Sequence, residues 1–300
     1  MAESKAVIKL RSKYENELIK QYKDALNSVR NEMVKTAEKY SQGGVISKTD
    51  ALLYARDKEL IQNINNELSK LGETTLNLQK ELQAELYKQG YFETIYSIDK
   101  QTGFEFSINS SNFAILNPET ISKLIADQTF LSASKGLNNR VKNLIKTDIV
   151  QGIIQGKSIP DISKSVKISL GKATNNEVRI ARTETHRAVE SGSIDASNFA
   201  DENGVKTSRQ WVSTIDDKTR PDHIEMDGQI AEVVNGEAYF TFPDGTMTTG
   251  PGLSGVAEQD INCRCTTIDL IEDYTPANRR VGSEVETYKT FNEWQKNKLG

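Results

Sequence analysis

The chain has 300 residues, of which 36% are hydrophobic, 27% are charged and 7% are aromatic, and its formal net charge is -4. This composition excludes collagen-like, disulfide-stapled and membrane-spanning proteins, and the length suits one large domain or two ordinary ones. The two cysteines and the absence of an apolar leader among the first residues predict synthesis in a reducing cytoplasm, without a membrane partner.

Charge is unevenly distributed along the chain. Residues 135–190 carry 11 basic and 5 acidic groups, whereas residues 191–275 carry 5 basic and 16 acidic groups. A net charge near zero gives no general attraction to nucleic acid, so contact with a polyanion must be local. The asymmetry is typical either of two regions with distinct partners or of two differently solvated surfaces.

Residues 1–90 are predicted to form a helical arm. Between residues 5 and 40, apolar residues recur in steps of three and four, which predicts one buried stripe on a long helix. A second helical run begins near residue 49 and reaches residue 86, with an interruption at Gly72. We expect an antiparallel pair, which acts either as a simple coiled-coil-like hairpin or as a docking arm for a larger assembly.

Residues 91–134 are predicted to form a connector. Short alternating runs at 96–98 and 104–108 flank a turn that contains Gly103, which favours a β-hairpin. Asn117, Pro118 and Glu119 then give the usual start of a helix, with an N-cap, a proline at the first position and an acidic first turn. That helix is expected to end near residue 131.

Residues 135–275 combine helices with a β-rich region. We predict helices at 137–155, 158–166 and 174–200, the last opened by the capping box formed by Thr174 and Glu177. Strands are expected at 208–213, 230–234, 238–242 and 266–271, with a hairpin turn at Asn235 and Gly236. The Gly- and Pro-containing linker 246–262 has a length typical of functional or disordered segments, and 276–300 is predicted to be a polar tail. The fold class is therefore α+β, with a small β-rich C-terminal domain packed on a central helix.

The four histidines and cysteines of the chain lie within 80 residues, namely His186, His223, Cys263 and Cys265. These residue types are the ligands of a Cys₂His₂ zinc site, with Asp217 or Asp227 as a substitute ligand. The spacing differs from that of ordinary zinc fingers, and buried thiols that pack as small apolar groups are the alternative. The buried-thiol alternative is favoured, so we expect no cofactor, and zinc is the one that the residue types leave open.

A thiol hydrolase would pair Cys263 with His223 and Asp227, although the sequence shows no oxyanion hole. The acidic run around Asp216 lacks the ligand order of an EF-hand and is more typical of a solvated loop pinned by Arg220. The glycines at 250–255 match neither of the Gly-rich phosphate-binding patterns.

On the helix at 174–200, Arg182 and Glu184 lie beside the apolar face. We expect them to form a salt-bridge network that reaches the acidic segment, for instance at Asp217 or Arg220, and locks its loops.

The ordered series Ala-Arg-Thr-Glu at 181–184, Trp211, the run from Asp216 to His223, Asp227-Gly228 and Asn-Cys-Arg-Cys at 262–265 resembles the phage Mu F-like family of minor head proteins. The resemblance covers about residues 135–272, within a Mu F-like domain expected at 135–275. It implies a non-enzymatic virion component of a tailed phage, assembled in the host cytoplasm, that binds the portal and packaged double-stranded DNA and aids head assembly or genome delivery. Scaffolding or major capsid protein is a further implied partner. No catalytic residue is carried over, and the motif positions are expected to hold the loop-rich domain together: Arg182, Glu184, Trp211, Asp217, Arg220, His223, Asp227, Asn262, Cys263, Arg264 and Cys265.

The basic segment supplies candidate DNA contacts. Its lysines are expected to bind phosphate, with a merely solvated surface as the alternative, and they are Lys142, Lys146, Lys157, Lys164, Lys167 and Lys172. Two other functions stay open, a metal-dependent or thiol hydrolase and a protein-binding adaptor without DNA contact.

Overall fold

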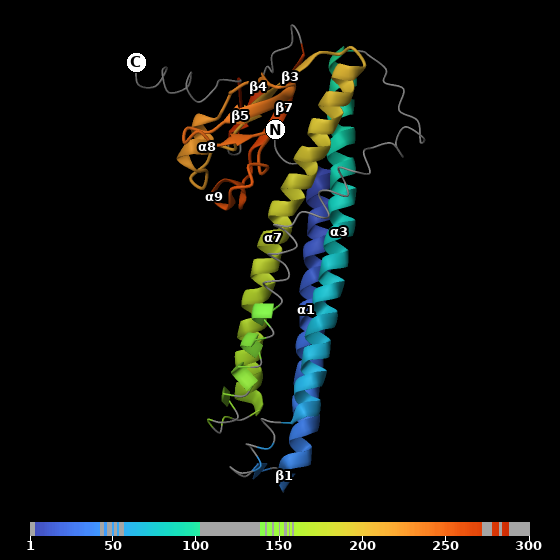
Figure 1. Ribbon diagram of the computed structural model, residues 1–300, viewed down its shortest axis with the longest axis vertical. Helices are drawn as coiled ribbons and strands as arrows, with labels where there is room; N and C mark the ends of the chain where they lie inside the picture. Colours follow the sequence, from blue (N-terminus) through green and yellow to red (C-terminus); the bar gives the residue numbers. More distant parts are fainter. Residues whose placement is uncertain are drawn as a thin grey trace. The chain divides into compact units, whose positions relative to one another are not determined.

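The computed structural model is an α+β protein with long helices and small antiparallel sheets (Figure 1). It describes residues 4–42, 45–46, 50, 53, 57–102, 159–271, 278–281 and 284–287, and scattered positions between 139 and 157. The chain divides into two compact units: a helical unit, Ser12–Glu81 with Ala126–Ala181, and a sheet unit, Met1–Arg11 with Leu82–Ile125 and Arg182–Gly300. Across the described residues, no helix combines the length and apolar character needed to span a bilayer.

The first helix, α1 (Lys5–Tyr40), has the predicted bounds and buries the predicted face. Tyr14, Leu18, Tyr22, Val29 and Met33 are all buried, at steps of four and seven. Long helices of mostly polar composition are stable when such a stripe packs against neighbours.

Helices α1 and α3 (Lys58–Thr102) run antiparallel within the helical unit, as expected. Lys39 Nζ donates to Glu59 Oε2 at 2.6 Å near one end of the pair, and Asn63 Nδ2 donates to Glu32 Oε2 at 2.8 Å further along. The turn between the helices includes the short strands β1 (Ser41–Gln42) and β2 (Val45–Ile46), which pair antiparallel.

Helix α3 is longer than the sequence predicted, and two expectations are wrong. Asp57 Oδ1 accepts a hydrogen bond from Leu60 N at 2.8 Å and so caps the start of the helix. The helix continues through Gly72, where an interruption was expected, and through 96–98, where a strand was expected. Ile95 and Ile98 are buried whereas Tyr96 is 67% exposed, so the apparent alternation is part of a helical pattern.

Helix α7 (Ile159–Glu202) is continuous, whereas the sequence predicted two helices separated before residue 174. Thr174 Oγ1 donates to Leu170 O at 2.8 Å, one turn earlier in the same helix, so it is no N-cap. Glu177, the other half of the expected capping box, is fully buried. Leu170, Ala173 and Ala181 are buried with it and carry the apolar face across the expected boundary.

In the sheet unit, α3 and α7 approach closely at two glycines. A Cβ on Gly192 would lie 2.0 Å from Tyr87 O, and one on Gly90 would lie 2.2 Å from Val189 O. Only a residue without a side chain allows this backbone-to-backbone contact.

The β-rich region agrees closely with the expected strands. Strand β3 (Thr207–Val212) pairs antiparallel with β7 (Thr266–Ile271), while β4 (Glu232–Val234), β5 (Glu237–Thr241) and β6 (Met247–Thr248) form a second sheet in that order. Asn235 and Gly236 both have positive φ, which is the geometry of a two-residue hairpin turn. Strand β7 is held on α7, because Ser197 Oγ donates to Asp269 Oδ1 at 2.5 Å.

The remaining predicted segments are partly described. The described residues between 139 and 152 are helical, in agreement with the helix predicted at 137–155. The predicted strand at 104–108 and helix at 117–131 lie outside the described residues. The expected linker 246–262 contains β6 and the short helix α9 (Ala257–Asp260), and the expected tail contains the antiparallel strands β8 (Asn278–Val281) and β9 (Glu284–Thr287).

Candidate functional site

Three of the four histidines and cysteines meet in the sheet unit. His223 lies on α8 (Pro221–Glu225), and Cys263 and Cys265 lie on the segment that leads into β7. His223 Nδ1 is 3.7 Å from Cys263 Sγ and 3.5 Å from Cys265 Sγ. All three residues are at most 8% exposed.

The other side of the His223 ring is held by a hydrogen-bonded chain. His223 Nε2 lies 3.0 Å from Gln259 Oε1, and Gln259 Nε2 donates to Asp222 Oδ2 at 3.0 Å. Because the Gln259 amide nitrogen is used on Asp222, its oxygen is left to accept the proton of His223 Nε2. A neutral imidazole in this arrangement turns the lone pair of Nδ1 toward the two sulfurs.

The thiols influence each other. The hydrogen bond between them raises the pKa of Cys263 and lowers the pKa of Cys265. Cys265 is therefore the sulfur that more readily carries negative charge in this cluster.

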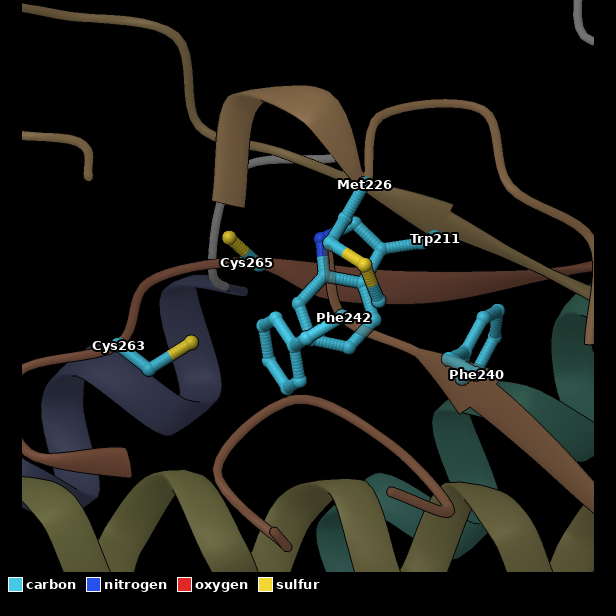
Figure 2. Close-up of a cluster of buried hydrophobic side chains, with 6 residues drawn as sticks. All are labelled: Trp211, Met226, Phe240, Phe242, Cys263 and Cys265. Atoms are coloured by element: carbon cyan, nitrogen blue, oxygen red, sulfur yellow. The ribbon is translucent and has the colours of Figure 1, made fainter. Parts of the chain in front are cut away.

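An aromatic core packs against the cluster (Figure 2). The ring centroid of Trp211 lies 5.4 Å from that of Phe240 and 5.5 Å from that of Phe242, in edge-to-face arrangements. The ring centroids of Phe242 and His223 are 5.3 Å apart. Trp211 Nε1 donates to Ser213 Oγ at 3.1 Å, so this buried polar group is paired. The rings, the histidine and the thiols are all buried together.

The acidic run forms a tied loop beside the cluster. Arg264 makes a two-pronged ion pair with Asp216, at 2.5 and 2.6 Å, and this pair lowers the pKa of Asp216. Arg220 Nη2 donates to Ile261 O at 2.6 Å, which agrees with the expectation that this arginine pins the loop. The ion pair is made by Asp216, whereas Asp217, which was expected to hold the domain together, is exposed.

The other motif residues also occupy structural positions. Asp227 Oδ1 accepts from Ser213 N at 2.9 Å, and Asn262 has a positive φ that turns the chain just before the cysteines. Glu184 is buried and accepts from Gln83 Nε2 at 3.1 Å and Arg187 Nη1 at 3.3 Å, so these partners belong to α3 and α7. Arg182 is exposed on α7.

His186, the fourth expected metal ligand, does not join the other three. The compact group of ligand atoms, all within 4.8 Å of one another, comprises His223, Cys263 and Cys265. His186 Nε2 is buried and has no hydrogen-bond partner among the described residues, and burial lowers its pKa to about 4.

Two buried carboxylates that the predicted motif did not include form hydrogen bonds between segments of the sheet unit. Glu190 on α7 accepts from Thr266 Oγ1 at 2.8 Å and Thr267 Oγ1 at 3.1 Å, and burial raises its pKa to about 7. Asp260 accepts from Ser254 N at 3.0 Å and Gly255 N at 2.9 Å, which orders the linker. Gln259 was likewise missed, because nothing in the linker pattern distinguishes it.

The candidate DNA-binding lysines belong to the helical unit where they are described. Lys164, Lys167 and Lys172 are exposed on α7, and Lys157 is exposed just before it. Lys142 and Lys146 lie outside the described residues.

Comparison with known proteins finds one matching family model and several relatives. Residues 143–268 match the model of the phage Mu protein F like proteins. The minor head protein GP7 of Bacillus phage SPP1 is 26% identical over 95% of this chain and 92% of its own length. The NAD(+)--arginine ADP-ribosyltransferase EFV of Enterococcus faecalis is 28% identical over 71% of the chain, and an uncharacterized protein of Haemophilus influenzae is 24% identical over 69%. The chain spans less than half of these last two proteins, 43% and 42%, and no solved structure matches.

Proposed function

We propose that the chain is a phage Mu F-like minor head protein, a structural component of a tailed-phage head that docks on the portal and contacts the packaged DNA. The observation that carries this proposal is the similarity to a minor head protein along nearly the full length of both chains. Assembly in the host cytoplasm, with scaffolding or major capsid protein nearby, is part of the same proposal.

The long helices are the proposed docking element. Helix α1 carries exposed apolar side chains at Ile8, Ile19 and Val34. Co-expression with the portal protein of the same phage tests the assignment. We expect the two proteins to co-purify, and elution of the chain free of portal protein would contradict docking on it.

The four exposed lysines of segment 157–172 are the proposed DNA-binding groups. Neutralising phosphates releases counterions, so affinity for duplex DNA should fall steeply with salt. Changing Lys157, Lys164, Lys167 and Lys172 to Gln should lower the slope of log K against log salt by about 0.9 for each phosphate that the variant no longer neutralises. A matched control replaces four exposed lysines of α1, namely Lys9, Lys13, Lys23 and Lys35. Equal reductions in both variants would indicate only a general charge effect, and a slope unchanged from wild type would favour an adaptor that does not bind DNA.

We propose a structural role for the His223 cluster and no hydrolysis. Asp227, the expected third member of a thiol hydrolase, accepts a hydrogen bond from Ser213 N, whereas the ring of His223 contacts the Gln259 amide. The thiols are also buried behind aromatic rings. The ADP-ribosyltransferase name belongs to a relative of which this chain covers 43%. Transfer of label from tagged NAD⁺ to arginine-containing protein by the purified chain would contradict a purely structural function of the chain.

A further inference from the structure

We propose that His223, Cys263 and Cys265 bind a zinc ion that joins α8 to the start of β7. The site uses one imidazole nitrogen and two sulfurs, a donor set that favours zinc over magnesium or calcium. It differs from the Cys₂His₂ set expected from the sequence, because His186 is outside the group of converging ligand atoms.

The spacing of the ligand atoms fits a tetrahedral ion. Zinc holds sulfur at about 2.3 Å and nitrogen at about 2.0–2.1 Å, so a nitrogen and a sulfur on one ion lie about 3.6 Å apart. The two distances from His223 Nδ1 to the sulfurs are 3.7 and 3.5 Å. The ion therefore requires little rearrangement of the side chains.

The surroundings of the ring support the same assignment. A metal-binding histidine usually donates its second ring proton to an oxygen that fixes the ring orientation. Gln259 Oε1 provides that acceptor at 3.0 Å, and Asp222 in turn holds the Gln259 amide. Gln259 is thus a positioning residue that acts through His223.

Burial gives the cluster a reason to hold a cation. A thiolate enclosed by Trp211, Phe242 and Met226 loses most of its hydration, and an adjacent metal ion compensates for that loss. The ion would also link chain segments 40 residues apart in a region with a small apolar core. Three protein ligands leave a fourth position for solvent or for a donor from outside the cluster.

Metal analysis of the full chain, purified without chelator and dialysed against zinc, tests the proposal. We expect about one zinc ion per chain, and on cobalt substitution the near-ultraviolet charge-transfer bands of a thiolate bound to cobalt. His223→Gln and Cys265→Ser should each weaken zinc binding by more than about 100-fold, and Gln259→Ala by about 10–100-fold. His186→Gln is the matched control and should leave zinc binding unchanged.

The outcomes are separable even where a variant fails to fold, because the cobalt spectrum is recorded on the unaltered chain. Substoichiometric zinc together with absent charge-transfer bands would overturn the proposal. An effect of His186→Gln as large as that of His223→Gln would overturn the three-residue ligand set. Neither result bears on portal or DNA binding, which are tested independently.

Discussion

The helical unit and the sheet unit differ in how completely the buried carboxylates Glu177, Glu190 and Asp260 are hydrogen-bonded. Glu177 in the helical unit accepts one hydrogen bond, from Gln79 Nε2 at 3.2 Å, and its Oε1 has no partner among the described residues. In the sheet unit, Glu190 accepts from two threonines and Asp260 from the backbone of two residues. Long apolar stripes can therefore support an incompletely paired carboxyl group, whereas the loop-rich unit depends on its polar contacts and one small aromatic core.

Removing the centre of that core should produce the largest effect. Phe240 is fully buried against Trp211, and Phe240→Ala should lower the free energy of unfolding by about 3–5 kcal/mol. Urea unfolding followed by Trp211 fluorescence, in a Trp294→Phe background, measures the change. Val233→Ala, at a side chain 74% exposed on β4, is the control and should change stability by less than about 0.5 kcal/mol. Similar shifts for both variants would show that the aromatic core does not stabilise the sheet unit.

The buried carboxyl group of the helical unit should make stability depend on pH. Burial raises the pKa of Glu177 from 4.5 to about 7. Below pH 4.5 the group is protonated in both states. As pH rises toward 7, the unfolded chain loses this proton first, so the stability contributed by the protonated group is progressively lost.

Glu177→Gln keeps an oxygen for Gln79 and removes the ionisation. We expect the free energy of unfolding of the variant to rise relative to that of the wild type as pH increases from 4.5 to 7. Above pH 7 the difference should reach up to about 3 kcal/mol. Urea unfolding followed by far-ultraviolet circular dichroism across this range gives the measurement. Exposed Glu81→Gln is the control, and its stability profile should run parallel to that of the wild type. A parallel profile for Glu177→Gln would show that this carboxyl group does not contribute to the pH dependence.

Glu177 also marks the limit of what the sequence could predict. Local patterns identified helix α1, the four main strands and the Asn235-Gly236 turn, because each depends on periodicity or turn chemistry within a few residues. The same local patterns made Thr174 and Glu177 a capping box and divided α7, since the contact with Gln79 comes from a distant part of the chain. Tertiary contacts, which a local pattern does not contain, determine that Glu177 lies inside a continuous helix.

The candidate site shows the same division. Residue types alone identified His223, Cys263 and Cys265 as candidates, and the structure brings them together. They also included His186, because an inventory of ligand types carries no distances. Gln259 could not be found in this way, since its role comes from the folded position of α9 beside His223.

The smallest of the expected effects concerns the helix contact inside the sheet unit. Gly192→Ala would place a methyl group 2.0 Å from Tyr87 O, so α3 and α7 must separate locally. We expect a decrease of about 1–3 kcal/mol in the free energy of unfolding, the usual range for overpacked contacts. Thermal and urea unfolding followed by circular dichroism measure it.

Gly171→Ala on the same helix is the matched control, because a Cβ there meets nothing within 4 Å. Alanine favours a helix interior over glycine by about 0.5–1 kcal/mol, so this variant should be more stable than the wild type. The two glycine-to-alanine substitutions in α7 should thus change the free energy of unfolding in opposite directions, which separates the effect of helix propensity from that of packing. If Gly192→Ala also stabilised the protein, the close approach of α3 and α7 at this glycine would not exist in solution.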